Sequence, residues 1–145
     1  IDGAMCGELV DGGSIYTLGP QPRSSVHHNY LHSQCNLYGV LYHDGGSGYF
    51  DTHHNVIANS SKAVWVLLNP DPIGTFQPFL HVHDNWVDKQ STANRMMVDC
   101  TPAGKVNCTV TNTTVVAGPW PNEAQAVIGA SGPRRVVRDT LLYFG

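Results

Sequence analysis

The stretches SVHHNYLH (residues 25–32) and DTHHNVIA (residues 51–58) share an HHN core followed by apolar or β-branched residues. The arrangement returns in HVHDNWVD (residues 81–88), in TVTNTTVV (residues 109–116) and, more weakly, in RVVRDTLL (residues 135–142). The aligned residues, at intervals of 26, 30, 27 and 27, are Asn29, Asn55, Asn85, Asn112 and Asp139. A near-constant interval indicates an internal structural repeat.

Each repeat is too short to hold a crossover helix and contains only short runs that look like strands. The runs between the aligned segments are GSIYTLG, YGVLYH, KAVWVLL, NRMMVDC and QAVIGAS. A period in the high twenties built from strands alone is typical of a parallel β-solenoid, whose coils stack about 4.8 Å apart. The sequence therefore predicts an all-β parallel β-helix of about five coils.

The aligned asparagines predict a ladder along this helix. A side-chain amide offers two donors and an acceptor, so stacked amides can bond to one another and to the turn backbone. The residues two after each asparagine should form an apolar column. Its members are Leu31, Ile57, Val87, Thr114 and Leu141.

We expect residues 1–145 to form one domain, and neither end looks capped. Solenoids need polar terminal caps, because the last coils otherwise expose their core. We therefore expect a longer β-helix, with the missing part mostly before Ile1, or another chain stacked on the open ends.

The composition of the chain limits which binding partners and which cellular compartment we expect. A net charge of −3 and a pI near 6.2 argue against a nucleic-acid footprint. No apolar run approaches the roughly 18 residues of a membrane span, and no signal peptide opens the chain. Three glycosylation sequons predict a secreted, extracellular glycoprotein; they begin at Asn59, Asn107 and Asn112.

Four cysteines allow three disulfide pairings. Cys100 and Cys108 flank a Pro/Gly turn, which favours a local bridge and leaves Cys6 to pair with Cys35. Neither pair has zinc-site spacing. Free buried thiols remain the alternative.

The run from DGGSIYTLGPQP to YHDGGSGYFDTHHN resembles right-handed parallel β-helix carbohydrate-active enzymes, closest to the glycoside hydrolases of families 141 and 120. The first set of matching residues is Asp11, Gly13, Ile15, Tyr16, Thr17, Gln21, Pro22, Asn29 and His32. The second set is Gly39, Leu41, Tyr42, Asp44, Gly46, Ser47 and Asn55. The resemblance covers roughly residues 8–60 and implies a right-handed helix, no cofactor and a polysaccharide lying along its outer face.

The resemblance implies that Asp44 is one catalytic carboxylate and Asp11 the other, although Glu8 or a residue before Ile1 could serve instead. Glycoside hydrolysis needs two carboxyl groups roughly 5 to 9.5 Å apart. The alternative is that both aspartates only form turns, since Asp-Gly is itself a turn signal. We expect four aromatic or imidazole side chains to bind the substrate: His43, Tyr42, Tyr16 and Trp65.

The two DGGS tetrads, at residues 11–14 and 44–47, are 33 residues apart, seven more than the first repeat interval. They are therefore not equivalent positions of one repeat. Seven extended residues reach up to roughly 23 Å, which argues against Asp11 as a partner of Asp44 unless the path is shortened.

The histidines define two further columns, one of His27, His53 and His83 and one of His28, His54 and Asp84. We interpret them as structural stacks and predict no metal, because a flat stack converges poorly on an ion.

A calcium-dependent polysaccharide lyase ranks below a hydrolase, since the acidic residues do not cluster. Two hypotheses remain: a secreted glycoside hydrolase, or a non-catalytic β-helix that binds glycans or builds a scaffold or filament.

Overall fold

The computed structural model describes residues 1–7, 9, 11–35, 37–60, 64–68, 77–89, 91 and 106–130. Strands account for most of these residues. In chain order the elements are β1 (Ile15–His27), β2 (Tyr30–His32), β3 (Gly39–His53), β4 (Val56–Ala58), β5 (Val64–Leu68), β6 (Gln77–His83), β7 (Trp86–Asp88), β8 (Val106–Thr111), β9 (Thr114–Val116) and α1 (Asn122–Ala130).

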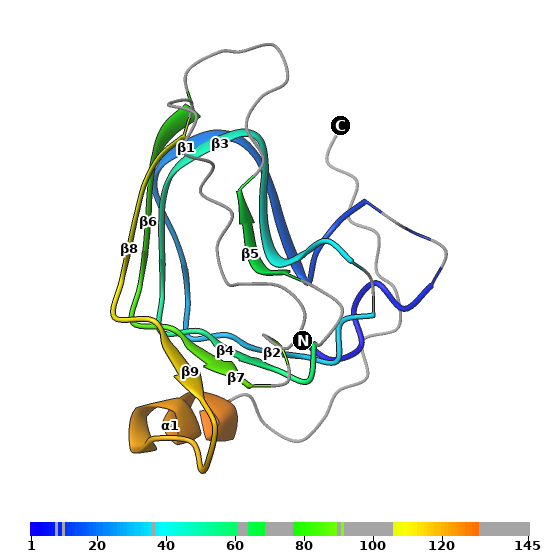
Figure 1. Ribbon diagram of the computed structural model, residues 1–145. Helices are drawn as coiled ribbons and strands as arrows, with labels where there is room; N and C mark the ends of the chain where they lie inside the picture. The colour runs from blue at the N-terminus through cyan, green and yellow to red at the C-terminus, as the bar shows by residue number, and fades with distance from the viewer. Residues whose placement is uncertain are drawn as a thin grey trace.

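The strands form two parallel sheets that meet at a corner (Figure 1). One has the order β1-β3-β6-β8, with β5 also paired to β3, and the other has the order β2-β4-β7-β9. All described strand pairs are parallel. Successive repeats of the sequence therefore supply successive strands of each sheet, which confirms the all-β prediction with parallel strands.

A two-residue corner carries the chain from the first sheet to the second in each described repeat. Its first residue lies in the left-handed region of φ, which Asn, Asp and His tolerate better than other side chains. The four corner residues and their φ values are His28 (53°), His54 (52°), Asp84 (49°) and Asn112 (49°). The second corner residue bonds to the next repeat, as in the hydrogen bond from Val56 N to Asn29 O at 2.8 Å.

The asparagine ladder is confirmed for its first three members. The Nδ2 of Asn29 donates to Oδ1 of Asn55 at 2.9 Å, and the Nδ2 of Asn55 donates to Oδ1 of Asn85 at 3.0 Å. Both Asn55 and Asn85 are fully buried. A buried amide needs such partners, because an unpaired polar group inside a protein is costly.

The predicted fourth member is wrong by one residue. Val82 pairs with Val110 and Trp86 pairs with Thr114, so Thr113 is in register with Asn85. Asn112 instead takes the left-handed corner position. The residue in the apolar column is therefore Val115, because the strand register, rather than the identity of the amide, decides the alignment. The fifth repeat, with Asp139 and Leu141, lies outside the described residues.

The core between the sheets is built from side chains that alternate inward along the strands. Leu31, Ile57 and Val87 project from the second sheet, and all three are fully buried. They belong to one cluster whose other buried members are Val40, Leu41, Phe50, Trp65, Val66, Leu80 and Val82. The predicted run KAVWVLL contributes β5 to this core, whereas NRMMVDC lies outside the described residues.

The run QAVIGAS, predicted as a strand, is largely helical and forms most of α1. Pro121 and Glu123 near its start are typical of a helix N-terminus. The helix buries Ala124 and Val127 against Val56 and Trp86 on the outer face of the second sheet. A short apolar run is compatible with a strand and with a buried helix face, so the hydrophobic pattern alone could not distinguish the two.

The predicted disulfide between Cys6 and Cys35 is present, with the two Cα atoms 4.8 Å apart. Cys108 is also disulfide-bonded, and its predicted partner Cys100 lies outside the described residues.

The sequon residues Asn59 and Asn112 are exposed at corners, while Asn107 lies within β8. No helix in the described ranges has the length and apolar character needed to cross a membrane.

Candidate functional site

Asp44 lies on the outer face of β3, beside the first part of β1. The register places Tyr16 opposite Tyr42 and Leu18 opposite Asp44. The Tyr16 hydroxyl donates a hydrogen bond to Oδ2 of Asp44 at 2.5 Å. The Tyr16 ring meets the Tyr42 ring edge-on at 5.1 Å, and Tyr38 stacks on the other side of Tyr42 at 5.8 Å. The Asp44 carboxylate is thus held by a phenol within a cluster of three aromatic rings.

Two carboxylates act on the Tyr16 phenol. Its pKa is raised well above the ordinary value by partial burial, then by the hydrogen bond and charge of Asp44, and finally by the charge of Asp11. The phenol therefore keeps its proton and remains the donor to Asp44. The negative charge of Asp11 thus acts on the same hydroxyl that donates to Asp44.

The two DGGS tetrads occupy different places, as predicted. Gly13 precedes β1 and lies against the start of β3, where an added Cβ would come within 2.5 Å of the Gly39 carbonyl oxygen. Gly45 and Gly46, within β3, have φ values of 31° and 74° and turn the strand directly after Asp44. Glycine at both positions thus permits a conformation that is strained for other residues.

Three of the four side chains expected to bind substrate are buried, which corrects that expectation. His43, Tyr42 and Trp65 are 1%, 2% and 0% exposed. His43 and Trp65 project into the core, and Tyr42 is covered by Tyr16 and Tyr38. A side chain without accessible surface cannot contact a polysaccharide, so Tyr16 alone of the four stays in the candidate site.

His43 has a structural role instead. Its Nδ1 lies 2.8 Å from the Thr17 hydroxyl and its Nε2 lies 3.1 Å from the Thr52 hydroxyl, and its ring contacts Phe50. Burial lowers its pKa from 6.5 to about 4. The neutral ring is therefore the form that the core accommodates.

We predict that His43 makes the fold acid-sensitive. Below pH 6.5 the unfolded chain takes up a proton that the folded chain refuses until about pH 4. Stability should therefore fall across this window as the pH drops, by about 3 kcal/mol in all. Urea denaturation of wild type and His43→Gln between pH 7 and 4 measures the effect. The variant should show a flatter pH profile, and parallel profiles would contradict the prediction.

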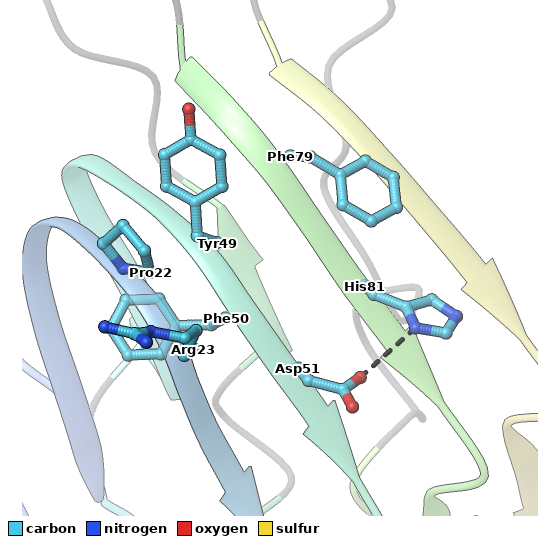
Figure 2. Close-up of a pocket in the computed structure, with 7 residues that line it drawn as sticks. All are labelled: Pro22, Arg23, Tyr49, Phe50, Asp51, Phe79 and His81. Atoms are coloured by element: carbon cyan, nitrogen blue, oxygen red, sulfur yellow. Dashed lines mark ion pairs between the residues drawn. The ribbon is translucent and has the colours of Figure 1, made fainter.

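A shallow groove of about 400 Å³ lies on the outer face of the first sheet (Figure 2). Tyr49 on β3 and Phe79 on β6 expose 48% and 40% of their surface and stand on neighbouring strands. The other lining residues are Pro22, Arg23, Phe50, Asp51 and His81. Exposed rings beside charged and imidazole groups suit a polar ligand with apolar faces.

Asp51, at one end of this groove, is surrounded by imidazoles. Its Oδ1 lies 3.2 Å from Nδ1 of His81 and 2.9 Å from Nε2 of His83, and its Oδ2 lies 3.9 Å from Nε2 of His53. Neither Asp51 nor His81 is among the residues that the sequence predicted for a site. The sequence nevertheless indicated this cluster. Residues 81 and 83 are two apart on β6 and so project from the same face, and the register pairs Asp51 with His81.

The histidine columns stack as predicted. The ring centroids of His27 and His53 lie 5.0 Å apart with planes 6° from parallel, and those of His53 and His83 lie 5.0 Å apart at 13°. The second column stacks His28 on His54 at 5.0 Å and 2°. Burial lowers the pKa of both His28 and His53, and neighbouring imidazoles lower it further, which disfavours simultaneous protonation of a stack.

Comparison of the chain with protein-family models, with curated proteins and with solved structures gives no match. A functional assignment therefore depends on the residues and their geometry.

Proposed function

We propose that this chain is part of a secreted right-handed parallel β-helix that acts on a polysaccharide as a glycoside hydrolase. Asp44 is one catalytic carboxylate and Asp11 is its partner. The observation that carries the proposal is the Tyr16 phenol, which donates to Asp44 and also lies in the field of Asp11. The Tyr16 phenol thus links the two carboxylates that the sequence predicts, by a hydrogen bond to Asp44 and by the charge of Asp11.

The parallel order of both sheets supports the β-helix. Every described repeat contributes at least one strand to the first sheet and one to the second, and turns between them through a left-handed corner residue. This regularity, with the buried ladder of Asn29, Asn55 and Asn85, is what a stack of coils requires. The disulfide between Cys6 and Cys35 agrees with an oxidising, extracellular location.

The surroundings of Asp44 suit the base or nucleophile of a glycosidase. The Tyr16 phenol donates a hydrogen bond to Oδ2 of Asp44 and so orients the carboxylate, and an oriented carboxylate can attack a sugar carbon or activate a water. The exposed ring of Tyr16, 43% accessible, offers a platform for the neighbouring sugar. Asp11 would then serve as the proton donor to the leaving oxygen.

The test is a panel of xylan, fucose-containing and galactose-containing polysaccharides incubated with the intact chain, with release of reducing ends as the readout. Hydrolysis of at least one polysaccharide is expected. Binding measured on the same panel separates the outcomes: a glycan that is bound but never cleaved would contradict the hydrolase and favour a binding protein.

Non-catalytic glycan binding is a second candidate, favoured by the groove between Tyr49 and Phe79. The residues lining this groove include Asp51 but neither Asp44 nor Asp11. Such a surface can hold a sugar chain on its rings without supplying a catalytic pair, because rings give stacking area and not acid–base chemistry.

We predict that Phe79→Ala weakens glycan binding about 10-fold, since an aromatic contact contributes roughly 1.4 kcal/mol. Val110→Ala is the matched control, because Val110 on β8 is also an exposed apolar residue of the first sheet but lies outside the groove and two strands away from β3. Affinity electrophoresis or calorimetry with a polysaccharide from the panel measures both. Equal affinities for the two variants would remove the groove from glycan binding.

A further inference from the structure

We propose that Asp51, His81 and His83 bind a divalent transition-metal ion of the zinc class at the end of the groove. Within the described ranges, these three residues form a group whose possible ligand atoms all lie within 4.8 Å of one another. Two imidazoles and one carboxylate are a ligand set that such ions accept. The proposal does not depend on glycan hydrolysis, because its test measures metal binding alone.

The backbone presents the three ligands from two adjacent strands. His81 and His83 are two residues apart on β6 and project from the same outer face. Asp51 on β3 is in register with His81, and its Oδ1 reaches a ring nitrogen of both histidines. The ligands therefore converge across the sheet, unlike the vertical column of His27, His53 and His83, which is a parallel stack.

The distances fit a shared ion. Oδ1 of Asp51 lies 3.2 Å from Nδ1 of His81 and 2.9 Å from Nε2 of His83. Neighbouring ligand atoms bonded at 2.0–2.1 Å to a tetrahedral ion lie about 3.3 Å apart. The three possible ligand atoms all lie within 4.8 Å of one another, so an ion placed among them would replace the direct contacts of Asp51 with the two rings.

A second observation concerns the far side of His83. Its Nδ1 lies 2.6 Å from Oδ2 of Asp84, while its Nε2 faces Asp51. A histidine that ligates a metal usually donates its other ring N–H to a carboxylate, which fixes the tautomer and orients the ring. Asp84 supplies this partner, so Nε2 is the nitrogen presented to the ion.

The site keeps an open side. The Asp51 side chain is 49% exposed and that of His81 is 39% exposed, and both line the groove. Phe79 stacks on His81 at 6.1 Å, and His81 stacks on His83 at 4.2 Å, so the rings are held from the other directions. Three protein ligands with one accessible position is the arrangement of sites that hold a water or a ligand on the metal.

Two other pairs of imidazoles could bind zinc, so the experiment must distinguish them from this site. Nδ1 of His27 lies 2.9 Å from Nδ1 of His28, and Nδ1 of His53 lies 2.8 Å from Nδ1 of His54. Among the described residues, neither pair has a third possible ligand atom close enough to form a group of three with it. The expected preference is therefore for Asp51, His81 and His83.

The experiment is calorimetric titration of Zn²⁺ into the metal-stripped chain of residues 1–145. We expect one tight site per chain. Asp51→Asn and His81→Ala should each weaken it about 100-fold or more, and Asp84→Asn should weaken it about 10- to 100-fold, as loss of an orienting carboxylate does. His27→Ala, the matched histidine control, should leave the affinity within about threefold of wild type.

Thermal unfolding gives a second readout that excludes misfolding. Each variant should unfold cooperatively without metal, and Zn²⁺ should raise the Tm of wild type and His27→Ala but not of Asp51→Asn. The proposal is overturned by the absence of a tight Zn²⁺ site in wild type. It is equally overturned if Asp51→Asn and His81→Ala both bind Zn²⁺ within 10-fold of wild type, or if His27→Ala loses the tight site.

Discussion

Replacing Asp44 by Asn should lower kcat/KM about 10²- to 10⁴-fold on whichever polysaccharide the chain hydrolyses, since positioned acid–base groups contribute factors of this size. The amide keeps the shape of the side chain and can still accept the hydrogen bond from Tyr16. It cannot take a proton or attack a sugar carbon. Glycan affinity should therefore stay within a few-fold of wild type while hydrolysis is lost.

Glu123→Gln is the control for a carboxylate-to-amide change, because Glu123 is exposed in the first turn of α1. It should hydrolyse at the wild-type rate. Equal rates for wild type and Asp44→Asn would remove Asp44 from the chemistry. Loss in Asp44→Asn with full activity in Asp11→Asn would keep Asp44 and exclude Asp11 as its partner.

Asn55→Ala should destabilise the fold by about 3–5 kcal/mol, a large share of the stability of an ordinary domain. The fully buried amide donates to the carbonyl of Val26 at 2.9 Å and to Asn85 at 3.0 Å. Its Oδ1 accepts from the backbone N of Asn29 at 3.1 Å and from Nδ2 of Asn29 at 2.9 Å. Alanine would leave several buried groups without partners, which urea denaturation would detect.

Asn29→Ala is the matched control, because Asn29 is only partly buried and stands at the start of the ladder. Its Nδ2 reaches the carbonyl of His27 and Oδ1 of Asn55, and the backbone bond from its own N to Asn55 would survive. We expect a loss of about 1–2 kcal/mol. An equal loss of folding stability in the two variants would contradict the claim that the buried hydrogen bonds of Asn55 cause its larger effect.

The sequence predicted those parts of the fold that a repeated side chain marks. Asn29, Asn55 and Asn85 bond to one another, and the histidines two residues before them are paired in the same register. At Asn112 the same letter led to the wrong register, because a corner tolerates Asn as readily as the ladder does. The apolar residues Val110 and Val115 decide the alignment there, and the asparagine does not.

The candidate site was partly predictable for the same reason. Alternation along β1 and β3 places Tyr16 and Asp44 outward and His43 inward, and this could have been read from the sequence. The burial of Tyr42 could not, since part of its cover comes from Tyr38, which lies just before β3 and outside any strand. To predict the cluster around Asp51, one must align position 51 with position 81. The repeat contains this 30-residue interval, so the sequence held the necessary information.

The most direct test of the central claim is a crystal structure of Asp44→Asn with an oligosaccharide from a polysaccharide that the wild-type chain cleaves. We predict a sugar over the outer face of β1 and β3, with a hydroxyl or ring oxygen about 3 Å from the side chain at position 44 and a ring stacked near Tyr16. An oligosaccharide bound only between Tyr49 and Phe79, or away from both strands, would contradict the assignment of Asp44 to the chemistry.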